Sequence, residues 1–307
     1  MAPVVVKVTE PMILGEGPHW HSEENALYFV NIGNSELHKY DPATGKDYKV
    51  KLPTAAHFIL PIEGKKNRFL ITQGCKVVEI EWYGYDNPAK ILRTITEVDK
   101  DFPENILNDG KADPLGRLFT GTMSQKYDPG PPLKMEKVGS LYRVDPDGTT
   151  TKFASDIMCS NGLCWDLKEK AFYYVDSLTY AIQRYDYDVA TGDISNPRNV
   201  FSLKEHKVEG SADGMTIDTD GNLWIAIFGP GSVIKVDPRT NKLLETISIP
   251  AKQVASVTFG GQNLDVLYVT TACLDLGGKP EYPGGATFAV TGINAKGYPN
   301  LKIRLEY

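Results

Sequence analysis

Six polar residues recur at one point of a repeated pattern, and several of them carry the oxygen atoms that hard metal ions prefer. Each stands ten to twelve residues ahead of a short β-rich run: Glu16, His57, Asn108, Asn161, Asp213 and Ser256. If a radial fold brings these positions together, two carboxylates and a carboxamide converge and resist burial without a positive partner. This pattern predicts a binding site built around one divalent cation.

The chemistry of the converging side chains narrows the choice of cation. All-oxygen ligands suit calcium, magnesium or manganese, and the pattern offers no cysteine and no second histidine for a dedicated zinc site, although carboxylates can hold zinc. The alternative is structural, because Glu16 and Asp213 could each fix a loop by accepting hydrogen bonds from backbone N–H groups. His57 shares the repeated position, as either a hydrogen-bonded structural residue or a catalytic one.

Two Asp-Gly pairs lie close together in SADGMTIDTDGNLWIA, residues 211–226, and they have different expected roles. Asp220-Gly221 directly precedes a β-rich run, where a hairpin turn is expected. The DTDG segment also resembles the start of an EF-hand loop, but the later ligands and the flanking helices are missing. Asp213-Gly214 is instead in register with Glu16 and Asn161, which assigns it to the candidate site.

The elements that position these residues follow from an internal repeat. Successive β-rich cores begin 42 to 54 residues apart: LYFVN from Leu27, FLITQ from Phe69, LFTGT from Leu118, FYYVD from Phe172, LWIAI from Leu223 and LYVTT from Leu267. Several are followed by a second strand and an acidic turn, and no long helical periodicity occurs. The repeat predicts an all-β chain: one six-bladed β-propeller domain over residues 1–307, with four-stranded antiparallel blades. The segment 4–10 is expected to pair into the last blade and close the ring.

Composition limits the classes of function. The 307 residues are 41% hydrophobic and 23% charged, with a net charge of −6 and a pI near 5.5. An acidic chain without a Lys/Arg cluster argues against nucleic acid as a partner, and no apolar run is long enough for a membrane span. We expect a cytoplasmic monomer that binds a small molecule. The cysteines, Cys75, Cys159, Cys164 and Cys273, are expected to be free thiols.

Several segments together carry a family resemblance: LGEGPHW (14–20), NDGKADPLGRLFTGTM (108–123), SNGLCW (160–165), FYYVDSLTYAIQRYDYD (172–188), ADGMTIDTDGNLWIA (212–226) and VTFGG (257–261). The chain resembles the gluconolactonase family, which includes senescence marker protein (regucalcin) and luciferin-regenerating enzymes. The resemblance implies a six-bladed propeller with one channel metal held by Glu16, Asn161 and Asp213. It also implies that Asn108 contacts the substrate and that Asp213 is the general base.

Two positions depart from the sugar-lactonase pattern. Ile106 stands where those members have a substrate-holding arginine, and Lys126 stands where they have a glutamate. Losing these groups removes contacts that recognise polyhydroxy substrates and favours a flat aromatic ligand. The resemblance then implies the luciferin-regenerating reaction, a hydrolytic conversion of oxyluciferin to 2-cyano-6-hydroxybenzothiazole. The alternatives are an aldonolactone (gluconolactone) hydrolase, a calcium-binding regulatory protein without turnover, and a scaffold for protein partners.

Overall fold

The computed structural model describes residues 2–128, 134–275 and 282–306, and nearly all regular structure in them is β-strand. Four sheets each hold four consecutive antiparallel strands. Their bounds are β2 Gly15–His21, β3 Ala26–Asn31, β4 Glu36–Asp41 and β5 Lys46–Lys51; β6 Ile59–Pro61, β7 Arg68–Gln73, β8 Lys76–Glu81 and β9 Lys90–Glu97; β10 Asn105–Ala112, β11 Leu118–Ser124, β14 Gly139–Val144 and β15 Thr150–Ile157; β16 Ser160–Asp166, β17 Ala171–Asp176, β18 Ala181–Tyr187 and β19 Ile194–Ser202.

The remaining large sheet has eight strands. It joins β20 Ser211–Ile217, β21 Leu223–Phe228, β22 Ser232–Asp237 and β23 Lys242–Ser248 to β24 Gln253–Gly260, β25 Val266–Ala272, β26 Phe288–Thr291 and β1 Val4–Lys7. A single residue pair, Phe228 with Gln253, links the two groups of four. The prediction of separate sheets therefore differs from the observed pairing at this junction. A small hairpin of β12 Tyr127–Asp128 and β13 Lys134–Met135, and a 3₁₀ turn at Ser177–Thr179, complete the regular structure described.

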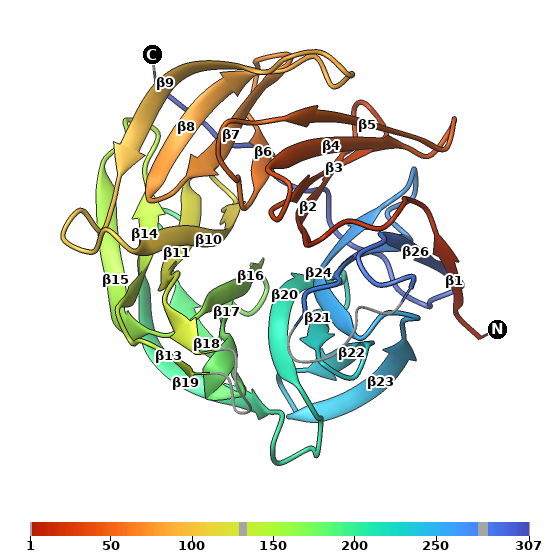
Figure 1. Ribbon diagram of the computed structural model, residues 1–307. Helices are drawn as coiled ribbons and strands as arrows, with labels where there is room; N and C mark the ends of the chain where they lie inside the picture. Colours follow the sequence, from red (N-terminus) through yellow and green to blue (C-terminus); the bar gives the residue numbers. More distant parts are fainter. Residues whose placement is uncertain (1, 129–133, 276–281, 307) are drawn as a thin grey trace.

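The sheets are arranged radially, so the fold is β-propeller-like (Figure 1). The first strand of each group, such as β2, β10, β16, β20 or β24, lies near the middle, and the last strand lies at the periphery. Burial follows the same order. The second strands β3 and β17 are buried along their whole length, whereas the peripheral β9 is mostly exposed or half-buried. This gradient explains why each apolar core in the sequence is the second strand of its group.

Large apolar side chains fill the space between neighbouring sheets. One such cluster contains Phe119 of β11 together with Phe172 and Tyr174 of β17, and the rings of Phe119 and Phe172 lie 5.4 Å apart. Fully burying an aromatic side chain contributes on the order of 2–3 kcal/mol. These contacts join one sheet to the next, so the position of each central strand is set by packing on both sides.

The first and last strands of the described chain lie in the same sheet. β1 pairs antiparallel with β26, with Val4 opposite Thr291 and Lys7 opposite Phe288. The predicted pairing of the 4–10 segment is confirmed, although the strand ends at Lys7. The ring is thus closed by hydrogen bonds between strands from the two ends of the sequence (Figure 1).

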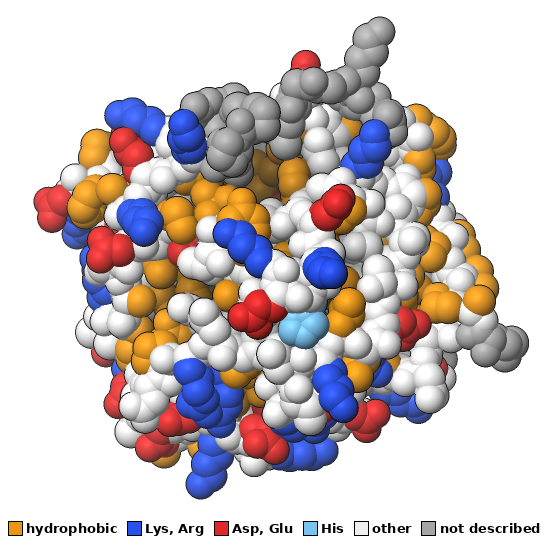
Figure 2. All heavy atoms as spheres, turned by 90° about the horizontal axis from the view of Figure 1, so that it is seen from below, with side chains coloured by type: hydrophobic (Ala, Val, Ile, Leu, Met, Phe, Trp, Pro, Cys, Tyr) orange, Lys and Arg blue, Asp and Glu red, His pale blue; other side chains and the backbone are white. Residues whose placement is uncertain are grey.

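The surface carries both signs of charge. Figure 2 shows Lys and Arg side chains interspersed with Asp and Glu over one side of the molecule, with apolar side chains between them. Among the described residues, no helix is long and apolar enough to cross a membrane. On this side, mixed charges give no single-sign surface of the kind that binds a polyanion.

Candidate metal and substrate site

The central strands share a defect in their pairing at the candidate site. The register shifts between Glu16 and His19 in β2, between Leu107 and Gly110 in β10, between Asn161 and Leu163 in β16, and between Ala212 and Met215 in β20. β24 has the same irregularity between Val254 and Ser256. A β-bulge places an extra residue on one strand and re-aims its side chain. The repeated polar positions therefore coincide with bulges in these central strands.

Three of the candidate side chains form one hydrogen-bonded chain. Asn108 Nδ2 donates to Asn161 Oδ1 at 3.0 Å and to the Ser160 carbonyl at 2.7 Å. His57 Nδ1 lies 3.1 Å from Asn108 Oδ1, which can only accept, so this nitrogen carries the proton. Asn161 Nδ2 donates to Ser177 Oγ at 2.8 Å. The carboxamides of Asn108 in β10 and Asn161 in β16 are thus held in fixed orientations.

Each carboxylate of the site makes ionisation of its neighbours less favourable. Burial, and then the charges of Asp213 and Asp109, raise the pKa of Glu16 well above its ordinary value. Burial and the charge of Asp109 likewise raise the pKa of Asp213. Within the described chain, Asp213 Oδ1 and Asp109 Oδ2 are buried without a hydrogen-bond partner. The site therefore combines concentrated negative charge with unsatisfied acceptor atoms.

This donor set fits a hard divalent cation. Orphaned carboxylate oxygens beside a carboxamide oxygen are the ligand types that calcium, magnesium and manganese prefer. In the part of the chain that the structure describes, no group of three His, Cys, Asp or Glu side chains could hold a metal. The candidate set contains two carboxylates, Glu16 and Asp213, so Asn161 would have to supply the third ligand.

Asp109 is the residue of this centre that the sequence pattern did not single out. It follows Asn108 in the NDG segment, is 5% exposed, and has a pKa raised by burial. Its carboxylate acts on both Glu16 and Asp213. Strict alternation would send adjacent residues to opposite faces, but the bulge in β10 breaks that alternation. The sequence feature that could have identified Asp109 is its acidic side chain directly after Asn108.

Two glycines let the central strands approach closely. A Cβ at Gly162 would lie 2.6 Å from the Asp213 carbonyl oxygen, and one at Gly214 would lie 1.9 Å from Ser256 Oγ. Both distances are below any normal contact, so a side chain would push β16, β20 and β24 apart. The glycines after Asn161 and Asp213 thus fix the spacing of the candidate ligands.

The second Asp-Gly pair is a turn, as expected. Gly221 has φ +81°, and its N–H donates to the Asp218 carbonyl at 3.0 Å between β20 and β21. Asn25, in the corresponding turn of the first sheet, also has a positive φ of 47°. Asp220 itself is exposed. Asp213 is almost fully buried, so the two aspartates differ in burial as well as in their position in the repeat.

The two positions that depart from the sugar-lactonase pattern lie in different surroundings. Ile106 is 6% exposed and is opposite Met123 in the sheet. Met123 Sδ lies 3.5 Å from Cys159 Sγ, which in turn is 3.5 Å from Asn161 Nδ2. Lys126 is exposed and forms an ion pair with Glu104 at 3.3 Å. An apolar, sulfur-rich wall therefore adjoins Asn161.

Cys159 is a poor nucleophile in this place. Burial, followed by the charges of Asp213 and Asp176, raises the pKa of its thiol far above the ordinary value. A reactive cysteine requires the opposite shift. All four cysteines are free thiols, as predicted, and Cys159 forms part of the wall.

His19 should make stability depend on pH. Burial, and then nearby His21, lowers its pKa to about 3 from 6.5. The unfolded chain binds this proton below pH 6.5 and the folded chain does so only near 3, so stability is fully present above 6.5 and falls as the pH drops. Over that window the loss is on the order of 1.4 kcal/mol per pH unit.

The variant His19→Gln should remove this part of the acid sensitivity. Urea unfolding of metal-free wild type and variant at pH 7.5, 6 and 5 measures it, with pH 7.5 as the reference for each protein. Between pH 7.5 and pH 5, wild type should lose more of its free energy of unfolding than the variant does. Parallel pH dependence would contradict the assignment.

The fold and the site together define a class of protein. They describe a propeller-like protein whose central strands carry carboxylates and carboxamides of the types that bind a divalent cation. Residues 14–273 match the family described as "SMP-30/Gluconolactonase/LRE-like region". The chain belongs to this family.

Individual relatives extend over nearly the whole chain. Regucalcin of Gallus gallus is 36% identical over 291 residues, 93% of each chain. A solved luciferin-regenerating enzyme is 39% identical with a TM-score of 0.93, and the match covers 99% of this chain and 100% of that one. The structure described as a calcium-binding protein, regucalcin, from Agrobacterium tumefaciens is 26% identical with a TM-score of 0.84 and covers 97% of both chains.

Proposed function

We propose that this protein is a metal-dependent hydrolase built on a single six-bladed propeller domain, with one divalent cation held by Glu16, Asn161 and Asp213. The observation that carries the proposal is the buried Asp213 Oδ1, which has no hydrogen-bond partner in the described chain. The negative charge of Asp109 also disfavours ionisation of this carboxyl. Calcium, magnesium, manganese and zinc are the candidates, and regucalcin relatives favour calcium. When bound, the cation would supply Lewis-acid polarisation of the substrate.

The chain's own residues would orient the substrate and move the proton. Asp213 is the proposed general base, because an ionised carboxylate within the candidate site can accept a proton. Asn108 is the proposed substrate contact, and His57 holds it through Oδ1. Ser177 holds Asn161 in the same way. The preformed hydrogen bonds reduce the cost of ordering these side chains during reaction.

The proposed substrate is the flat aromatic molecule oxyluciferin, which would react with one water to give 2-cyano-6-hydroxybenzothiazole and thioglycolic acid. The wall of Ile106, Met123 and Cys159 offers apolar and polarisable contacts beside Asn161. Thioether sulfur makes favourable contacts with aromatic rings. The similarity to a luciferin-regenerating enzyme at 39% identity supports the same substrate class.

An aldonolactone such as gluconolactone is the second candidate. The family description includes gluconolactonases. Lactone hydrolysis would use the same cation and the same base. Its difficulty is Ile106, because an alkyl side chain cannot hold a substrate hydroxyl as arginine does.

The discriminating experiment measures consumption of oxyluciferin and of gluconolactone by purified protein, each with EDTA and after addition of calcium, magnesium, manganese or zinc. Cation-dependent loss of oxyluciferin with little lactonase activity supports the first proposal. The reverse result selects the lactone. Cation binding without turnover of either substrate would refute the hydrolase proposal in favour of a calcium-binding regulator.

The same cation should stabilise the fold. At 100 times its dissociation constant, a ligand bound only to the native state adds about 2.7 kcal/mol to the free energy of unfolding. Thermal melts with EDTA and with each cation measure this increase. Melts that are identical under all conditions would leave the carboxylates with a structural role.

A further inference from the structure

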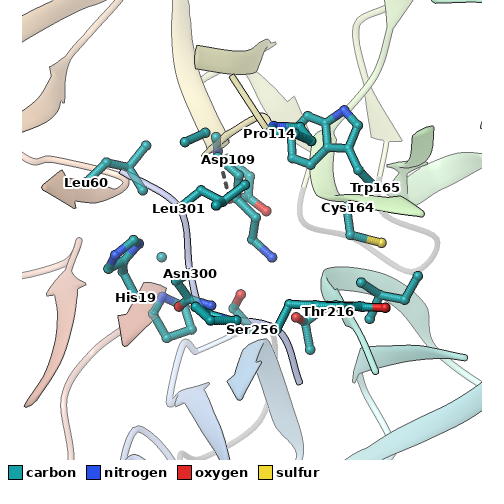
Figure 3. A pocket seen from close by; sticks show the side chains of 18 of the residues that line it. His19, Leu60, Asp109, Pro114, Cys164, Trp165, Thr216, Ser256, Asn300 and Leu301 are labelled. Carbon is teal, nitrogen blue, oxygen red and sulfur yellow. Dashed lines mark hydrogen bonds between the residues drawn. The ribbon is translucent and has the colours of Figure 1, made fainter. Parts of the chain in front are cut away.

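A cavity adjoins the candidate cation site and shares Asp109 with it. It has a volume of about 380 Å³ and is lined by segments of several sheets and by the C-terminal segment Tyr298–Leu301. In Figure 3, Asp109 and Trp165 face Ser256 and Thr216 across it. The volume is within the range of small-molecule sites in proteins.

The lining residues lie on the C-terminal side of the candidate ligands in the central strands. Ala112 lies four residues after Asn108, Cys164 three after Asn161, and Thr216 three after Asp213. At about 3.3 Å per residue, this separation is roughly 10 Å along each strand. Ile106, Met123 and Cys159 are absent from the lining of this cavity, so it lies apart from the wall that they form.

The walls are mainly apolar and are held in place. Leu60, Pro114 and Trp165 line the interior, and the exposed Leu167, Tyr298 and Leu301 lie along the lining toward solvent. Asn300 anchors the C-terminal segment by accepting hydrogen bonds from Trp20 N at 2.7 Å and Thr258 Oγ1 at 2.9 Å. Gly297 and Ile303 on either side of it form β-bridges to Asp218 and Ile62. Exposed apolar side chains around a preformed hollow indicate an apolar ligand.

Asp109 and Lys111 are the buried charged residues of the lining. His19 also lines the cavity, but burial lowers its pKa to about 3, and the exposed Lys168 donates from Nζ to the Thr219 carbonyl at 3.1 Å. Asp109 Oδ2 is buried without a hydrogen-bond partner in the described chain, although Asp109 lines the cavity. Lys111 also lines it, and its Nζ donates to the Met215 carbonyl. When Asp109 and Lys111 are both charged, or both neutral, the pair carries no net charge. A ligand with a net charge would leave that charge uncompensated in an apolar cavity.

We infer that this cavity is a second ligand site, which takes an uncharged aromatic molecule of one or two rings with a hydroxyl group at one end. The rings contact the apolar walls and the hydroxyl group exchanges hydrogen bonds with Asp109 Oδ2 and Lys111 Nζ. A hydroxyl group both donates and accepts, which matches the acceptor and the donor present. The inference does not depend on the proposed hydrolase activity.

The test uses 2-naphthol and naphthalene as probes, with binding to the full-length protein measured by calorimetry in EDTA. Wild type should bind 2-naphthol at least about tenfold more tightly than naphthalene, because a hydrogen bond to a charged partner contributes at this level. Lys111→Met should remove most of that preference. Thermal melts check that the variant folds.

A second variant locates the bound probe without altering the polar end. Leu301→Trp enlarges a partly exposed side chain that lines the cavity and should weaken 2-naphthol binding at least tenfold. The matched control is Leu244→Trp, at a similarly exposed position on the peripheral β23, which should bind as wild type does. Asp213→Asn should also retain binding, since Asp213 does not line the cavity.

Three results would overturn the inference: unchanged affinity in Leu301→Trp, equal affinity of wild type for the two probes, or loss of binding in Asp213→Asn. None of them bears on whether oxyluciferin is hydrolysed. The proposed function and the second site can therefore fail separately.

Discussion

The variant Asp213→Asn is expected to lose hydrolytic turnover by about 10³-fold or more, because it removes both a cation ligand and the proposed general base. The metal-free variant should nevertheless melt at a higher temperature than metal-free wild type. The pKa of Asp213 is raised in the fold by burial and by Asp109, so ionisation of this carboxyl opposes folding at neutral pH. Asparagine has the same shape and removes that cost.

The sequence provides a matched control in Asp220→Asn, an exposed aspartate in the second Asp-Gly pair. It should keep wild-type turnover, melting and cation response. Glu16→Gln should behave like Asp213→Asn in cation binding. The measurements are initial rates and melts with EDTA and with added cation. A variant Asp213→Asn with normal rates and a normal rise in melting temperature would refute the site.

The variant Arg117→Met is expected to cost about 3–5 kcal/mol of stability, since it leaves a buried charge without its partner. Arg117 Nε donates to Asp113 Oδ2 at 2.6 Å, and the side chain of Asp113 is fully buried. The guanidinium also donates to the carbonyls of Val189 at 2.7 Å and Ala190 at 3.2 Å. It thereby ties the β10–β11 turn to the β18–β19 hairpin of the next sheet.

Thermal or urea unfolding measures the effect, which corresponds to a fall in melting temperature of about 10 °C. The control is Arg198→Met, whose exposed pair with Asp186 should contribute less than about 1 kcal/mol. Arg117→Lys should recover only part of the loss, since an ammonium group cannot reproduce the forked donors. Equal stability of the two methionine variants would contradict the role given to Arg117.

The strand pattern of this chain was readable from its sequence because burial is extreme. Runs such as LYFVN and FYYVD are buried at every residue, so each stands out in a chain whose peripheral strands are polar. The different roles of Asp213 and Asp220 could also be predicted, because the repeat places Asp213 at the start of a central strand and Asp220 in a turn. Both distinctions depend on periodicity, which sequence records directly.

What remained hidden depends on local irregularity or on distant segments. The bulge of β10 brings Asp109 to the same centre as Asn108, and a period of two cannot reveal it. The single link between β21 and β24 and the β12–β13 hairpin carry no strong apolar signal. The cavity needs Tyr298–Leu301 to lie against strands from the other end of the chain, a contact that no short-range pattern encodes.

The pairing of β1 with β26 also has a consequence for the order of events during synthesis. Val4–Lys7 leaves the ribosome before its partner Phe288–Thr291, which is made on the order of tens of seconds later. Until then β1 presents unpaired N–H and C=O groups that could join a neighbouring nascent chain. Slower elongation before residue 288 should thus lower the soluble yield, and a permutant that encodes β1 directly after β26 should escape that penalty.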